Sequence, residues 1–227
     1  MKIMSYEDIT IDVIDQTPNP LAKVIRAAAI TQHQFPSSES VQDPASIIKY
    51  LFTAEHHSPF EFACLDMEIH NCSRSFLAQI TRQRTFTFMS ASQHYQDYRD
   101  YPCVVHPDLV DSLCMRNGLA ASYMSYERLV DSGVVVEEAR QVLPNAAAVN
   151  LRVKADARNL MYFFRQRRCE RNCAEMIYVA DAMWAIANRW FPDLFSLVGA
   201  PCFNGKCNQG KMQSPKCRIK IDEDLEA

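Results

Sequence analysis

The stretch EFACLDMEIH, residues 61–70, indicates the fold class, because its side chains alternate between apolar and polar. Every second residue from Ala63 to Ile69 is apolar, and the positions between them include Asp66 and Glu68. A period of two is typical of a β-strand with one buried face. The chain therefore contains a strand that packs one side against a core.

Segments with helical character surround this strand. We expect helices over residues 21–33, 45–55, 73–83, 107–131, from Val136 to Leu143-Pro144, and 155–189. Residues 85–101 lack a clear period but hold five aromatic residues, so an ordered loop is expected there. The pattern predicts an α/β (α+β) fold in one domain over residues 1–227, with residues 218–227 as a frayed tail.

Composition narrows the function classes. The chain has 227 residues, 48% of them hydrophobic, which suffices for one core. A signal-like start and a long apolar run are both missing, so a cytoplasmic protein is expected. The nine cysteines are odd in number and read as reduced thiols, and their spacing predicts no metal site.

Arginine clusters are the strongest local signal. The net charge is only −3, yet arginines crowd two stretches, at residues 74–84 and 152–171. Neither common phosphate-binding glycine loop occurs among the five glycines, so a nucleotide would be held by side chains and helix ends. A solvated basic face is the alternative interpretation.

One of these clusters opens a specific motif. Residues 82–95 read RQRTFTFMSASQHY, in which two arginines one residue apart are followed, after seven residues, by Ser92. This segment resembles the signature of flavin-dependent thymidylate synthases, RHR, seven residues, then S, with Gln83 in place of the histidine. The resemblance extends to HHSPFE at 56–61, EEARQVLP at 137–144, ARNLMYFFRQR at 157–167 and GKCNQGKM at 205–212.

The resemblance implies a fold and a reaction. The family has a central, mainly antiparallel sheet flanked by long helices, and its active sites lie between subunits of a homotetramer. It implies C5-methylation of a uridine monophosphate, with methylene-tetrahydrofolate as carbon donor and NADPH-reduced FAD as hydride source. The protein supplies binding and electrostatics, since side chains cannot supply a hydride.

The resemblance also implies residue roles. Nucleotide contacts are expected from Gln79, Arg82, Ser90, Ser92, His94, Arg140 and Arg167. Of these, Arg82, Ser92 and Arg167 are the expected catalytic residues, because a guanidinium at the uracil carbonyl edge would stabilise charge developing on the ring. Flavin contacts are expected from His56, Ser58, Glu61, Arg82, Gln83, Arg84, Asp156, Arg158, Tyr162 and Arg171.

Several pocket positions depart from the family pattern. Ser90 replaces a glutamate and His94 an arginine, which gives room and a hydrogen-bonding partner near the sugar. We hypothesise that UMP is a substrate alongside or instead of dUMP, as in the UMP-methylating branch of polyoxin-type nucleoside antibiotic synthesis. Three flavin positions also differ from the family: Asp156 and Tyr162 each replace an asparagine, and Arg171 replaces a histidine.

Other functions stay open at this point. Because Gln83 replaces the signature histidine, the protein could be an FAD- and nucleotide-binding homologue without turnover. C5-hydroxymethylation is a further alternative. A cysteine-nucleophile thymidylate synthase would need Cys202, which lacks the histidine that follows such a nucleophile. An RNA-binding module is disfavoured by the absence of an RNP-like pattern and by the negative net charge.

Overall fold

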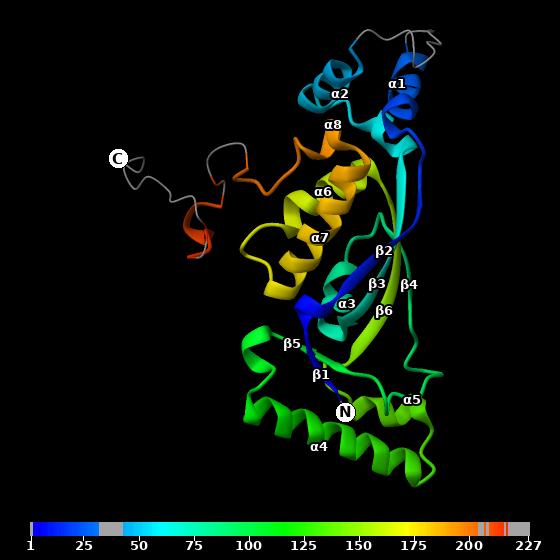
Figure 1. Cartoon of the computed structure of the whole chain (residues 1–227), viewed down its shortest axis with the longest axis vertical. Helices are drawn as coiled ribbons and strands as arrows, with labels where there is room; N and C mark the ends of the chain where they lie inside the picture. Colours follow the sequence, from blue (N-terminus) through cyan, green and yellow to red (C-terminus); the bar gives the residue numbers. More distant parts are fainter. Residues whose placement is uncertain (1, 32–42, 204–206, 208, 216, 218–227) are drawn as a thin grey trace. The chain divides into compact units, whose positions relative to one another are not determined.

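The computed structural model of the protein describes residues 2–31, 43–203, 207, 209–215 and 217 (Figure 1). The expected frayed tail and part of the 205–212 segment lie outside these residues. No helix within the described part of the chain is long and apolar enough to cross a membrane.

The strands are β1 (Ile3–Ser5), β2 (Thr10–Gln16), β3 (Cys64–Ser73), β4 (Thr87–Ser90), β5 (Cys103–Val105) and β6 (Ala148–Asp156). The α-helices are α1 (Pro20–Ile30), α2 (Pro44–Thr53), α3 (Arg74–Ile80), α4 (Leu113–Asp131), α5 (Val136–Ala139), α6 (Ala157–Arg167), α7 (Ala174–Trp190) and α8 (Pro192–Phe195).

The main sheet has the strand order β2-β3-β6-β4. Strands β3 and β6 run antiparallel, because Ala157 bonds to Ala63 at one end of the pair and Arg74 bonds to Ala147 at the other. Strands β1 and β5 form a separate parallel pair. The mixed helical architecture with an antiparallel sheet is thus confirmed.

Backbone contacts divide the chain into two compact units, each made of two segments. Unit 1 comprises Met1–Ile14 and Met67–Val153, and unit 2 comprises Asp15–Asp66 and Lys154–Ala227. Strands β2, β3 and β6 each continue from one unit into the other. The description below treats each unit by itself.

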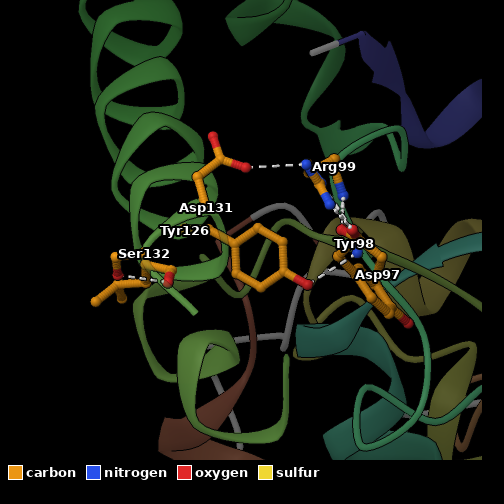
Figure 2. A network of polar contacts seen from close by, with 7 residues as sticks. Asp97, Tyr98, Arg99, Tyr126, Asp131 and Ser132 are labelled. Atoms are coloured by element: carbon orange, nitrogen blue, oxygen red, sulfur yellow. Dashed lines mark hydrogen bonds and ion pairs between the residues drawn. The ribbon is translucent and has the colours of Figure 1, made fainter. Parts of the chain in front are cut away.

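In unit 1, helix α4 packs its tyrosines against the chain that leads from β4 to β5. Tyr126 is fully buried beside Tyr98, and its hydroxyl accepts a hydrogen bond of 3.0 Å from the Tyr98 backbone N–H. Figure 2 shows the same hydroxyl next to Asp97, to which it donates. Arg99 bonds to Asp97 at 2.6 Å and to Asp131 at 3.2 Å. The expected ordered loop is therefore fixed to α4 by polar contacts.

In unit 2, the core lies between α6, α7 and α8, which are yellow to orange in Figure 1. Phe163, Phe164 and Phe195 are fully buried there, and Phe164 meets Phe195 edge-on at 5.7 Å. The Trp190 indole N–H donates to the carbonyl of Thr17 at 3.0 Å, which ties the end of α7 to the start of the unit. This core supports α6, whose residues the resemblance assigns to the site.

Four local expectations are corrected. The helix over 155–189 is two helices, because residues 168–173 turn and the side-chain amide of Asn172 takes the carbonyls of Gln166 and Cys169. The strand expected at 61–70 is β3 at 64–73, and Glu61 lies in the short 3-10 helix Ser58–Phe62. Strand β4 lies inside the expected loop, and β6 falls where no strand was predicted.

Candidate functional site

The signature arginines lie in a turn after α3. Ser73 begins that helix, and its hydroxyl accepts from the Phe76 N–H at 2.9 Å. The helix ends at Ile80, so Arg82 lies beyond the helical stripe that was expected to carry it. The backbone N–H of Arg82 bonds to the carbonyl of Gln79 at 3.3 Å. Arg82 and Arg84 are both exposed, which leaves their guanidinium groups accessible to an anion.

The segment after β4 carries three expected nucleotide contacts. Ser90 ends β4 and is exposed, and the Ala91 N–H bonds to the carbonyl of Asn150 at 3.0 Å. The Ser92 hydroxyl accepts from the His94 N–H at 3.1 Å, a turn that fixes the backbone locally.

His94 joins two of the sequence motifs. Its Nδ1 lies 2.8 Å from a carboxylate oxygen of Glu137, at the start of the 137–144 segment. Arg140 follows in the same segment, in the 3-10 helix Arg140–Val142. The structure therefore brings the 90–94 stretch against the segment that contains Arg140, with Glu137 as the carboxylate beside His94.

In unit 2, three of the expected flavin residues, Glu61, Arg158 and Tyr162, form a connected polar network. Arg158 donates to the carboxylate of Glu61 and to the hydroxyl of Tyr162, and these bonds raise the pKa of Arg158, the Glu61 bond most. Its guanidinium carbon lies 6.0 Å from the centre of the Tyr162 ring. Spacing by four on α6 was expected to give Arg158 and Tyr162 a common face, and their contact confirms it.

His57 extends this network, whereas the flavin contact expected from the sequence is its neighbour His56. The Nδ1 of His57 lies 3.1 Å from the Tyr162 hydroxyl, and its Nε2 lies 3.2 Å from the carbonyl of Phe52. The ring of His56 meets that of Tyr50 edge-on at 6.0 Å. Only the contact geometry distinguishes the adjacent histidines.

Asp156 and Ser58 occupy the ends of helices. The carboxylate of Asp156 accepts from the Asn159 N–H at 2.8 Å and from the Asn159 side-chain amide at 2.7 Å. Asp156 is thus the N-cap of α6, a role that an acidic residue fills well. Ser58 opens the 3-10 helix that carries Glu61.

Arg167 and Arg171 do not share a helix face, which corrects an expectation from their spacing. Arg167 ends α6 and donates to the side-chain oxygen of Asn172 at 3.2 Å. Arg171 lies in the turn that follows α6 and bonds to the Gln209 side chain. The helix ends between them, where the Asn172 side-chain amide bonds to the carbonyl of Gln166, near the end of α6, and to that of Cys169 in the turn that follows.

Two cavities flank the exposed face of α6. One, of about 550 Å³, is lined by Tyr162, Arg165, Arg171, Asn172 and Gln209 among others. The other, of about 260 Å³, is lined by His57, Tyr162 and Arg165, with Glu55. The first holds two guanidinium groups and, among the described residues that line it, no carboxylate, so it suits an anionic ligand.

Cys202 is a partly buried thiol. Burial chiefly, and then the neighbouring Cys217, raises the pKa of Cys202 above its ordinary value. A nucleophilic cysteine needs the opposite shift, because the thiolate is the attacking form. Across the described part of the chain, no group of three or more His, Cys, Asp or Glu side chains is arranged to hold a metal ion.

The predicted site residues divide between the two units. Gln79, Arg82, Gln83, Arg84, Ser90, Ser92, His94 and Arg140 belong to unit 1, and His56, Ser58, Glu61, Asp156, Arg158, Tyr162, Arg167 and Arg171 to unit 2. Sequence reasoning missed Glu137, His57 and Asn172 as partners of these residues. Glu137 and His57 stand inside recognised motifs, but at positions whose side-chain direction no motif specifies.

Comparison with known proteins gives a consistent result. The model of the family "Thymidylate synthase complementing protein", Thy1, matches residues 12–193. The flavin-dependent thymidylate synthase of Geobacter sulfurreducens is 32% identical over 218 residues, covering 91% of this chain and 94% of that protein. The enzyme of the same name from Clostridium tetani is 25% identical, covering 92% and 94%.

Solved structures share the fold. The UMP/dUMP methylase PolB from Streptomyces cacaoi, bound with 5-Br dUMP, superposes with a TM-score of 0.73 at 23% identity. The alignment covers 86% of this chain and 96% of PolB. The same protein bound with 5-Br UMP gives a TM-score of 0.72.

Proposed function

Because the chain belongs to the Thy1 family of flavin-dependent thymidylate synthases, we propose that it methylates C5 of a uridine monophosphate. One observation carries the proposal: the family match over residues 12–193 contains every expected site residue, from His56 to Arg171. The sequence lacks the common phosphate-binding glycine loops, and the arginines of both units can bind a phosphate instead. The polar network around Arg158 adds support, since it connects three expected flavin contacts.

The nucleotide would be held by guanidinium groups. Arg82, Arg140 and Arg167 are the proposed ligands of the phosphate and of the uracil carbonyl edge, with Gln79 and Ser92 as hydrogen-bonding partners. A guanidinium at a carbonyl oxygen stabilises the negative charge that grows there as the ring becomes nucleophilic. Arg82, Arg167 and Ser92 are therefore the proposed catalytic residues.

FAD is the proposed cofactor, and the donor set fits it. Arg158, fixed by Glu61 and Tyr162, and Arg171, in the cavity of about 550 Å³, offer cations and hydrogen bonds suited to a diphosphate. Bound FAD, reduced by NADPH, would supply the hydride, and methylene-tetrahydrofolate the carbon. Around it the chain's own task is to bind and orient the reactants and to exclude water.

The sugar preference follows from Ser90 and His94. A small hydroxyl at position 90 leaves room for a ribose 2′-OH, and Glu137 satisfies His94 without a carboxylate at that position. Admitting a hydroxyl needs only space, whereas excluding it needs a specific contact. We propose that UMP is a substrate together with dUMP, as the name of the structurally similar PolB states for that enzyme. A biosynthetic role outside DNA precursor supply would follow.

A single-turnover assay tests the proposal. The purified protein is mixed with FAD, NADPH, methylene-tetrahydrofolate and either UMP or dUMP, and the products are identified by mass. We expect the C5-methylated product from UMP, and a shift of preference toward dUMP in the double variant S90E/H94R. A dUMP preference of the wild type that the double variant leaves unchanged would contradict the assignment of the sugar contacts.

Controls separate the rival chemistries. The variant C202S should keep its activity, because the raised pKa of Cys202 disfavours a nucleophilic thiolate. A product heavier by one oxygen atom would indicate hydroxymethylation instead of methylation. We also propose that the protein is a homotetramer. Light scattering coupled to size-exclusion chromatography measures its mass, which should be four times that of one chain.

Gln83 motivates a second candidate, a flavin- and nucleotide-binding homologue without turnover. It stands where the family signature has a histidine. If the wild type binds FAD but forms no product, Q83H should restore product formation. Flavin reoxidation that is unaffected by the carbon donor would support this second candidate.

A further inference from the structure

His57 and Tyr162 form a directed hydrogen bond within unit 2. The two side chains come from the segment before the 3-10 helix Ser58–Phe62 and from α6, and their polar atoms lie 3.1 Å apart. The His57 ring also packs near the rings of Phe52 and Phe60, at 6.0 and 6.1 Å. His57 is therefore held on three sides, while Tyr162 keeps 37% of its surface exposed.

The polarity of this bond follows from the other nitrogen of His57. Nε2 lies 3.2 Å from the carbonyl of Phe52, which can only accept, so Nε2 carries the hydrogen in the neutral ring. Nδ1 is then an acceptor, and the Tyr162 hydroxyl donates to it. Because Arg158 donates to the same hydroxyl, the single proton of Tyr162 is directed away from the guanidinium.

These contacts place His57 within an ordered chain of hydrogen bonds that ends at the Phe52 carbonyl. Arg158 donates to Glu61 on one side and to Tyr162 on the other, Tyr162 donates to His57, and His57 donates to Phe52. The orientation of the Tyr162 hydroxyl is fixed from both sides. The oxygen of that hydroxyl thus offers its remaining lone pair to a ligand, and presents no donor.

We infer that His57 is a positioning residue of the flavin site, acting through Tyr162. The inference rests on the proposed function and adds a residue to it, since the family resemblance assigns His56 and not His57. Tyr162 stands where the family has an asparagine, which both donates and accepts. With His57 as partner, Tyr162 becomes an acceptor only, and therefore favours a ligand N–H at this point.

A double-mutant cycle on FAD binding tests the inference. The dissociation constant of FAD is measured by fluorescence titration of the apoprotein for wild type, H57F, Y162F and H57F/Y162F. Phenylalanine keeps an aromatic ring at position 57 and removes both the Nδ1 acceptor and the Nε2 donor to the Phe52 carbonyl. We expect H57F to weaken binding roughly three- to tenfold, the usual effect of one hydrogen bond. The double variant should bind no more weakly than Y162F, because His57 acts through that hydroxyl.

Two further variants distinguish positioning from a general structural effect. H57Q retains an acceptor and a donor, so its affinity should lie closer to wild type than that of H57F. H106F exchanges a histidine whose ring lies beside Tyr6 in unit 1, and should leave FAD affinity unchanged. The visible spectrum of bound FAD, which reports hydrogen bonding to the ring system, should change in H57F and not in H106F.

The outcomes separate the inference from the proposed function. Wild-type affinity in H57F, or independent effects that multiply in the double variant, would overturn the role of His57 while leaving the flavin site in place. Failure of the wild type to bind FAD at all would overturn the proposed function, and this inference with it. Melting temperatures of the apoproteins verify that every variant is folded during the titration.

Discussion

At the scale of single residues, the Tyr126 hydroxyl satisfies two partners at once, the Tyr98 N–H and the Asp97 carboxylate (Figure 2). The variant Y126F leaves the N–H of the buried Tyr98 without this acceptor. Loss of a partner for a buried polar group costs about 1–3 kcal/mol. We expect a decrease of that size in the free energy of unfolding, measured by urea denaturation. The variant Y50F, at a ring that is 60% exposed, is the control and should change little.

Asp97 gives a pH dependence of known sign. A hydrogen bond from Arg99, chiefly, lowers the pKa of Asp97 below its unfolded value. Its stabilising contribution is therefore present above the unfolded pKa of about 4 and lost as the pH falls through the lower folded pKa. The side chain is 37% exposed, so screening limits the pair to about 0.2–1 kcal/mol. The stability difference between wild type and D97N should shrink from pH 7 to pH 3.

We propose that the negative charge of Glu137, which pairs with His94, weakens binding of the anionic nucleotide. Its carboxylate lies 2.8 Å from the His94 ring, in the segment where the nucleotide is proposed to bind. The variant E137Q removes this charge, and we expect UMP to bind roughly two- to fivefold more tightly. Glu138 provides a matched control, because it carries the same charge but bonds to Gln141. Equal effects of E137Q and E138Q in calorimetric titrations would point to general electrostatics instead.

At the scale of elements, the end of α6 depends on a residue outside the helix. The Asn172 side chain accepts from Arg167 and donates to the carbonyls of Gln166 and Cys169. The variant N172A should raise the KM for UMP roughly three- to tenfold, because Arg167 loses its fixed orientation. The exposed Asn117 on α4 supplies the control N117A. An unchanged KM with a lowered melting temperature would show a purely structural cap.

Elements also show what the sequence could and could not predict. Strand β3 followed from alternation alone, because burial on one face leaves a period of two in the side chains. Strand β6 has the same alternation, with Leu151, Val153 and Ala155 buried. Its end overlaps the helical pattern that begins at Ala155, and this overlap hides the strand in the sequence. The helix break at 168–173 contains no proline or glycine that would predict it. A side-chain amide caps the helix end there instead.

The candidate site shows the same limit. Motif spacing predicted the contact of Arg158 with Tyr162, because both lie on one helix face. It did not predict the contacts of Arg158 with Glu61 or of His94 with Glu137, which join segments far apart in the chain. Such pairs form through tertiary packing. A single sequence therefore shows which charged residues are present, but not which of them pair.

At the scale of the whole molecule, all nine cysteines are free thiols. No covalent bond links the two units beyond the chain itself. We expect the reductant TCEP to leave the melting temperature unchanged, and titration of the urea-denatured protein with Ellman's reagent to find nine thiols. A drop in melting temperature on reduction would reveal a disulfide and contradict the structure.

Strand β4 has a consequence for how this enzyme changes over generations. It lies at the edge of the four-stranded sheet, and Thr87, Met89 and Ser90 are exposed. Substitutions at exposed positions usually alter stability by less than about 0.5 kcal/mol. Mutations at the end of β4, where the sugar contact is proposed, therefore stay above the stability threshold that removes most variants. Lineages can explore new nucleotide preferences there by neutral drift, one substitution at a time.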